Sequence, residues 1–195
     1  MLSEVEVSMK KRLAVFASGT GTNFDAIARS CAEGVLDAEV AVMVCDKPGA
    51  AVIEKAARYG VDTFVFSPKS YPNKAAFETE IVKVLDAKNI DLVCLAGYMR
   101  IVGDVLLGAY EGRIINIHPS LLPSFKGAHA VEDAVAYGVK VYGITIHWVN
   151  ADLDGGRIIA QRAFEYDGND PAEVHRLGQP IEHKLYVETI AKLIK

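Results

Sequence analysis

The chain has 195 residues, 51% of them hydrophobic, and a formal net charge of −4. This length predicts one domain with a core large enough to fold without disulfides or structural metals. The mild acidity argues against general nucleic-acid binding, which needs a basic face. It is compatible with a small anionic substrate held in one local pocket.

The three cysteines lie in apolar runs and are odd in number. This usage predicts buried thiols in a reducing compartment rather than a disulfide framework. No apolar run reaches the roughly 18 residues that a membrane span requires, and residues 1–11 lack the apolar core of a signal peptide. We therefore expect a cytoplasmic protein in which residues 1–11 form a disordered leader, with Met1 or Met9 as the natural start.

Apolar runs alternate with helical patterns along the rest of the chain. Strands are predicted at residues 13–17, 40–45, 63–65, 92–96, 113–117, 141–149 and 157–163. Helices are predicted from residue 24, with apolar residues at helical spacing up to Cys31, and at 50–59, 75–87 and from Pro171 onward. Pro180 is expected to break or kink the last helix, because proline lacks the N–H that a helix interior needs.

Continuous apolar strands that alternate with helices predict an α/β fold. We expect a single domain built on a mainly parallel, twisted sheet with helices on both faces. In such sheets ligands bind beyond the carboxyl ends of the strands. The glycine-containing loop at 18–23 and the loop after residue 117 both follow strands, so both are expected at that edge.

The loop SGTGTN at residues 18–23 is a candidate phosphate site. Its glycines let the backbone approach a ligand, Thr22 and Asn23 can cap the next helix, and free N–H groups at a helix N-terminus bind phosphate. The loop fails the dinucleotide fingerprint because Phe24 stands where a third glycine belongs. Asp46, at the end of the second strand, nevertheless resembles the ribose-binding acid of dinucleotide folds. A plain strand-to-helix turn is the alternative.

The segment NIHPSLLP at 116–123, followed by LDGG at 153–156, holds the most informative polar residues. Asn116 and His118 lie two apart at the end of a strand, so both side chains point into one cleft. Asp154 is expected to orient the imidazole and favour its protonated form. An amide, an imidazole and a carboxylate suit a reaction in which a carbonyl oxygen gains charge and a proton moves near neutral pH. A structural histidine and an ordinary Asp-Gly turn are the alternatives.

Other polar residues carry weaker signals. His147 shares one face of a strand-like run with Thr145, so it is either a support for the site or a satisfied core histidine. Ser120 lacks the nucleophile elbow of serine hydrolases. No metal is predicted, because no cysteine pair and no metal-ligand spacing accompany the remaining histidines, His129, His175 and His183.

Together these segments resemble the phosphoribosylglycinamide formyltransferase family of purine biosynthesis. The resemblance covers about residues 12–190 and rests on SGTGTN (18–23), AGYMRIV (96–102), NIHPSLLPSFKGAHA (116–130), GITIHWVNADLDGGRIIAQ (143–161) and, more weakly, QPIEHKLY (179–186). It implies a formyltransferase-like, Rossmann-related fold. It also implies direct transfer of a formyl group from 10-formyltetrahydrofolate to the amine of glycinamide ribonucleotide, with no metal and no covalent enzyme intermediate.

The resemblance implies a role for individual residues within one domain, 12–195. The catalytic residues would be Asn116, His118 and Asp154. The ribonucleotide phosphate would be bound by Gly21, Thr22, Asn23, Gln179 and Glu182. The folate would be bound by Lys74, Met99, Arg100, Ile101, Val102, Asn116, Asn150, Ala151, Asp152, Leu153 and Asp154. The phosphate-binding half would span about residues 12–110, and the catalytic and folate-binding half about 111–195.

The chain departs from the family pattern at three positions: Arg157, Pro180 and Val187. The nearest alternative function is formyltetrahydrofolate hydrolysis, although that family usually has a second histidine where this chain has Pro119. A methionyl-tRNA formyltransferase, a non-catalytic nucleotide-binding module and a dinucleotide oxidoreductase are further alternatives. The expected partners are small-molecule substrates, with no nucleic acid and no membrane, in a monomer or homodimer.

Overall fold

The computed structural model of the protein describes residues 10–195. Residues 1–9, which make up most of the predicted leader, lie outside the described residues. Lys11, which the sequence analysis placed in the leader, is the first residue of a strand and pairs with Ala38.

A single sheet of seven strands organises the fold, in the order β3-β2-β1-β4-β5-β6-β7. The strands β3, β2, β1, β4 and β5 pair in parallel, whereas β6 and β7 are antiparallel to their neighbours. The prediction of an α/β fold with a mainly parallel sheet is therefore confirmed. The strands are β1 Lys11–Phe16, β2 Ala38–Cys45, β3 Thr63–Val65, β4 Leu92–Leu95, β5 Ile114–His118, β6 Val141–Trp148 and β7 Ile158–Glu165.

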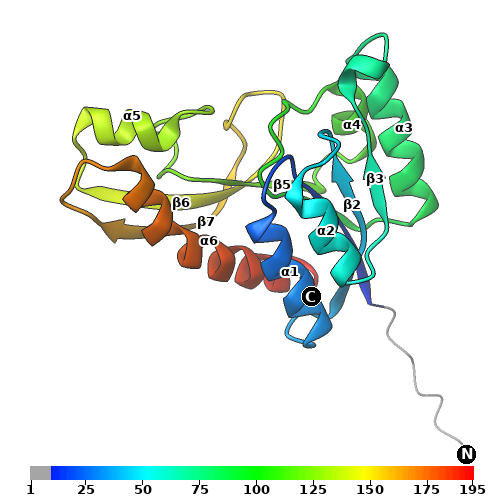
Figure 1. Ribbon diagram of the computed structural model, residues 1–195, viewed down its shortest axis with the longest axis horizontal. Helices are drawn as coiled ribbons and strands as arrows, with labels where there is room; N and C mark the ends of the chain where they lie inside the picture. The colour runs from blue at the N-terminus through cyan, green and yellow to red at the C-terminus, as the bar shows by residue number, and fades with distance from the viewer. Residues whose placement is uncertain (1–9) are drawn as a thin grey trace, which may run out of the picture.

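Helices cover both faces of this sheet (Figure 1). The α1, α2 and α6 helices pack on one face, and α3 and α4 pack on the other. The short helices α4 and α5 were not predicted from the sequence. The helices are α1 Thr22–Ala32, α2 Ala51–Arg58, α3 Lys74–Ala87, α4 Asp104–Ala109, α5 Ala130–Tyr137 and α6 Pro171–Leu193, with a 3-10 turn η1 at Pro68–Ser70.

The apolar run in β1 explains why the sheet needs two layers of helices. Leu13 and Val15 belong to the core under α1 and α6, whereas Ala14 and Phe16 belong to the core under α3 and α4. All four side chains are fully buried. Because successive strand residues point to opposite faces, a continuous apolar run is buried only when both faces are covered.

The long helix α6 passes through Pro180 without a break. The predicted break is therefore wrong, although proline in a helix interior typically costs about 3 kcal/mol. Packing offsets this cost. The buried Tyr186 hydroxyl donates a hydrogen bond to the Leu95 carbonyl at 2.8 Å, and Leu185 and Ile190 join the core shared with α1. Tertiary contacts, rather than local propensity, determine the length of this helix.

The three cysteines are free and buried. Burial raises the pKa of the Cys31 thiol to about 11 and raises that of Cys94 further. Since the thiolate is the reactive form, these side chains act as apolar packing groups. Within residues 10–195, no helix combines the length and apolar character needed to cross a membrane.

The loop between β6 and β7 carries Asp154 and is held tightly against the end of β6. A Cβ atom added at Gly156 would lie 1.6 Å from the Trp148 carbonyl oxygen, so only glycine fits there. Asp154 has a φ of 45°, in the left-handed region that non-glycine residues rarely adopt. The strand pairing and Gly156 thus hold this loop in one conformation.

Gly156→Ala is expected to lower the free energy of unfolding by about 2 kcal/mol or more, because a backbone oxygen cannot move aside without distorting β6. The matched control is Gly108→Ala in α4, where an added Cβ meets no atom within 4 Å. There alanine should leave stability unchanged or raise it by up to about 1 kcal/mol, owing to its higher helix propensity. Urea denaturation measures both variants, and equal stability would contradict the described loop.

Candidate active site

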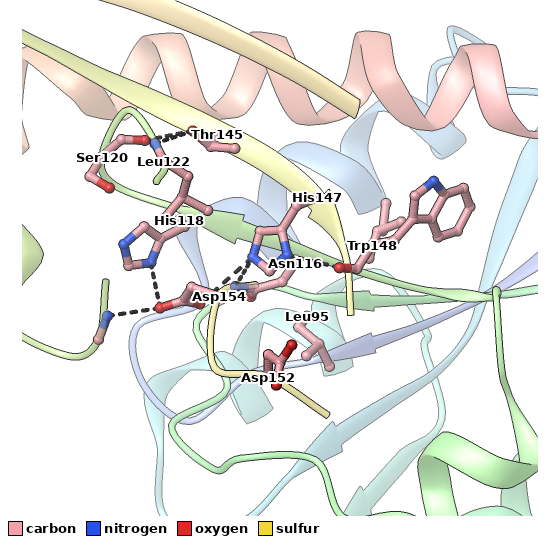
Figure 2. Close-up of polar contacts among 12 residues, drawn as sticks. Leu95, Asn116, His118, Ser120, Leu122, Thr145, His147, Trp148, Asp152 and Asp154 are labelled. Carbon is pink, nitrogen blue, oxygen red and sulfur yellow. Dashed lines mark hydrogen bonds and ion pairs between the residues drawn. The ribbon is translucent and has the colours of Figure 1, made fainter. Parts of the chain in front are cut away.

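The pairing of β5 with β6 brings polar side chains together on one face of the sheet. Asn116 lies opposite His147, and His118 lies opposite Thr145. His147 donates from Nδ1 to the Trp148 carbonyl at 2.9 Å, and its Nε2 lies 3.2 Å from the Asn116 amide nitrogen, placed to accept one amide proton (Figure 2). An amide NH2 group has two protons. His147 therefore orients Asn116 and leaves its second proton for another acceptor.

His118 is 4% exposed and has an oxygen facing each ring nitrogen. Its Nε2 donates a hydrogen bond to the Phe125 carbonyl at 2.8 Å. Its Nδ1 lies 3.5 Å from Oδ2 of Asp154 (Figure 2). A proton on either ring nitrogen therefore has an oxygen facing it.

The Asp154 carboxylate connects the parts of this cluster. Its side chain is 9% exposed, Oδ2 accepts the Gly127 N–H at 2.8 Å, and Oδ1 lies 3.7 Å from Nε2 of His147. Burial raises the pKa of the Asp154 carboxyl, but His147, the Gly127 amide and His118 lower it by more, to about 2. The carboxylate therefore stays ionised over the whole range in which a histidine titrates.

A second hydrogen-bond network supports the chain that follows His118. Thr145 donates to the Ser120 carbonyl at 2.7 Å and accepts from the Leu122 N–H and the Gln161 amide. The Ser120 hydroxyl donates to the Ser124 carbonyl at 2.7 Å. Ser120 thus stabilises its own loop, which agrees with the sequence argument against a serine nucleophile.

The loop at residues 18–23 ends in the N-terminus of α1. Gly21 has a φ of 70°, and a Cβ there would lie 2.3 Å from Val52, so glycine is needed. The prediction that Thr22 or Asn23 caps α1 is wrong, because the Ncap is Gly21 and no side chain caps the helix. The first N–H groups of α1 are therefore available to an anion.

Asn23 instead joins this loop to α6. Its amide donates to Oε2 of Glu182 at 3.0 Å, and its carbonyl oxygen is buried without a partner among residues 10–195. Burial raises the pKa of Glu182, although the Asn23 hydrogen bond opposes the shift. Gln179 is exposed one turn earlier in α6, on the same face as Glu182. The structure thus brings Asn23 and Glu182 together, as the resemblance implied.

Four residues expected to bind folate line part of a pocket of about 400 Å³, within the size range of small-molecule sites. Lys74, Ile101, Val102 and Ala151 line it, and Lys74 also donates to the Ile101 carbonyl at 3.1 Å. The cluster residues do not line this pocket, but the loop at 150–154 leads from it to Asp154. Three large apolar side chains of these segments are exposed: Met99, Ile101 and Leu153.

Other members of the expected folate set make local contacts. The Asn150 side chain accepts the Asp152 N–H at 3.0 Å, which shapes the turn before Asp154. Arg100 pairs with Asp46 at 2.7 Å, and Ser18 occupies the other Asp46 oxygen at 2.5 Å. With both oxygens engaged, Asp46 is not free to bind a ribose. The dinucleotide alternative thus loses the feature that favoured it.

Sequence reasoning left three contributors to the cluster unassigned. His147 was predicted either to support the site or to be a core histidine. The pattern that pointed to it was its position on the same strand face as Thr145. The Phe125 carbonyl and the Gly127 N–H were missed, since backbone groups leave no residue-type pattern. Within the described chain, no three His, Cys, Asp or Glu side chains gather into a metal site.

Comparisons with known proteins match the chain over most of its length. A family profile described as "Formyl transferase" matches residues 11–190. The chain is 51% identical over 185 residues to the phosphoribosylglycinamide formyltransferase of Bacillus subtilis, which covers 94% of this chain and 95% of that protein. It is 41% identical over 180 residues to the trifunctional purine biosynthetic protein adenosine-3 of Bos taurus, covering 91% of this chain and 18% of that protein. The solved structure of glycinamide ribonucleotide transformylase 1 from Geobacillus kaustophilus matches with a TM-score of 0.93 at 51% identity, over 95% of this chain and 100% of that chain.

The pKa of Asp154 predicts a pH dependence of stability. Because its folded pKa of about 2 lies below the usual 3.8, ionised Asp154 stabilises the fold above pH 4, and this contribution is lost as pH falls toward 2. Asp154→Asn is therefore expected to lower the free energy of unfolding by about 2 kcal/mol at pH 7, with roughly half that difference at pH 3. Urea denaturation of both proteins at the two pH values measures it. A difference independent of pH would contradict the buried, ionised carboxylate.

Proposed function

This chain belongs to the formyl transferase family, and we propose that it transfers the formyl group of 10-formyltetrahydrofolate to the amine of glycinamide ribonucleotide in purine biosynthesis. The observation that carries this proposal is the cluster of Asn116, His118 and Asp154, in which the buried His118 faces the Asp154 carboxylate and His147 orients the Asn116 amide. The relatives named for this reaction favour transfer over hydrolysis.

The reaction begins when the amine nitrogen attacks the formyl carbon. A C–N bond forms, and the carbonyl π electrons move to the oxygen of a tetrahedral intermediate. The second amide proton of Asn116 and Nε2 of His118 donate to that oxygen. Because Nε2 faces the Phe125 carbonyl at 2.8 Å, the substrate oxygen takes the place of this carbonyl. Removing one such donor typically costs a factor of about 10²–10³ in rate.

The intermediate collapses when its bond to the folate nitrogen breaks. The proton from the attacking ammonium passes through His118 and water to the departing folate nitrogen, so no covalent enzyme intermediate is needed. Asp154 faces Nδ1 of His118 throughout. It favours the protonated ring and, with a pKa of about 2, does not itself take the proton.

The two substrates bind on either side of this cluster. The phosphate binds the N-terminus of α1 at Gly21, Thr22 and Asn23, supported by Gln179 and Glu182 of α6. The unpartnered Asn23 carbonyl oxygen accepts a hydrogen bond from the ribonucleotide.

The folate ring lies against the wall at residues 99–102 and the loop at 150–154. Its acidic tail runs toward Lys74 at the rim of the pocket. Residues 12–195 act as one domain, with phosphate binding in the first half and catalysis in the second. We place the reaction in the cytoplasm, where buried free thiols remain reduced.

His118→Ala and Asp154→Asn are each expected to lower kcat by about 100-fold or more while changing substrate dissociation constants far less. The first change removes an oxyanion donor, and the second removes the charge that holds the imidazolium. The control is His129→Ala. His129 is exposed at the start of α5, and its side chain makes no capping hydrogen bond. Steady-state kinetics with calorimetric binding measure all three variants. Near-normal kcat in either cluster variant would refute the assignment.

An assay with and without the amine separates transfer from hydrolysis. The protein is mixed with 10-formyltetrahydrofolate, with or without glycinamide ribonucleotide, and folate absorbance is followed. We expect turnover only in the presence of the ribonucleotide. Equal turnover without it would identify a hydrolase, and no turnover in either mixture would identify a binding module.

A further inference from the structure

Asp46 lies at the carboxyl edge of the sheet but outside the proposed catalytic cluster. It follows β2 directly, is 8% exposed, and has each carboxylate oxygen engaged by a different loop. Ser18, in the loop after β1, donates its hydroxyl proton to Oδ1 at 2.5 Å. Arg100, in the loop after β4, donates from Nε to Oδ2 at 2.7 Å.

These contacts close a ring across three neighbouring strands, β2, β1 and β4. The Ser18 hydroxyl also accepts the Met99 N–H at 2.9 Å, and the Ser18 N–H donates to the Gly97 carbonyl at 3.0 Å. A hydroxyl has a single proton, so donation to Asp46 while accepting from Met99 fixes its rotation. Ser18 therefore joins the loop of residues 18–23 to Gly97 and to Met99, the first residue of the wall at 99–102.

The charge of Asp46 is costly unless both of its partners are present. A carboxylate this deeply buried needs a compensating cation and hydrogen bonds. Arg100 supplies the cation, and its side chain remains 40% exposed, so the pair lies at the rim of the site. The ring thus holds the two loops at one spacing, and opening it on either side leaves a buried charge incompletely paired.

We propose that Asp46 is a positioning residue that keeps the ribonucleotide loop (residues 18–23) and the folate wall (residues 99–102) at a fixed spacing. This inference rests on the proposed function, because it needs residues 18–23 to bind one substrate and residues 99–102 to bind the other. Asp46 touches neither reacting group. The rest of the wall is held from the opposite side, where Lys74 and the buried Glu78 bond the backbone at Ile101 and Gly103. Ser18 bonds the start of this wall directly, and Asp46 adds a second connection by holding both the Ser18 hydroxyl and the Arg100 guanidinium.

The decisive variant is Asp46→Asn, which keeps an acceptor for Ser18 but turns an amide N–H toward the Arg100 donor. KM should rise by about tenfold for both substrates, the size expected for one charge-assisted hydrogen bond, while kcat stays within about threefold. The matched control is Glu39→Gln. It removes the Arg12–Glu39 ion pair, which joins β1 and β2 at the ends opposite to Ser18 and Asp46. Both KM values of this control should equal those of the wild type.

A change at Arg100 tests whether Asp46 links the two loops or only packs locally. Arg100→Gln should raise the KM of the ribonucleotide, a substrate that Arg100 does not bind in the proposed arrangement. Should Asp46→Asn not fold, as thermal melting would show, Ser18→Ala opens the ring at the hydroxyl and is expected to raise the same two KM values.

The possible outcomes separate this inference from the proposed function. A rise in only one KM, or a lower melting temperature with both KM values unchanged, in an active enzyme would overturn the positioning role alone. A wild-type protein without transfer activity would overturn the proposed function, and the positioning role with it.

Discussion

The burial of the Asp154 carboxylate is the constraint on which the catalytic cluster depends. A carboxylate that is 9% exposed loses most of its hydration and must be compensated by donors. Here the Gly127 N–H supplies one hydrogen bond at 2.8 Å, and Nδ1 of His118 lies 3.5 Å from the same carboxylate oxygen. The same groups that stabilise the anion therefore fix the distance between the imidazole and the site where charge develops.

This constraint couples two loops that are distant in sequence. The loop at 149–157 places Asp154, at a left-handed φ of 45°, against the end of β6. The loop after β5 returns across it, so that the Phe125 carbonyl accepts from His118 and the Gly127 N–H donates to Asp154. Neither loop is held in place by its own backbone alone. The Gly127–Asp154 hydrogen bond joins the two loops, so the geometry around Asp154 depends on both.

Much of this arrangement is predictable from sequence because it follows from periodicity. Buried apolar runs predict the parallel strands, and the spacing of Asn116 and His118 predicts that they share a face. The LDGG segment predicts Asp154 as the partner of His118, and the family resemblance implies the same residue. Periodicity cannot predict the short helices α4 and α5, which have too few turns for a pattern to emerge. Nor can it predict the roles of the Phe125 carbonyl and the Gly127 amide, since every residue carries these groups. The continuity of α6 through Pro180 depends on distant core contacts such as that of Tyr186.

Two buried carboxylates at one edge of the sheet have partners of different chemistry, and the difference follows from their tasks. Asp154 faces imidazoles, which are side chains able to take up or give up a proton, as the proposed reaction requires. Asp46 faces a guanidinium, which never loses its proton in a protein, so its contact persists through the catalytic cycle. An arginine beside Asp154 would provide a permanent charge but no transferable proton. A histidine beside Asp46 would make the spacing of the two loops depend on pH. The proposed mechanism uses the first pairing as variable and the second as constant.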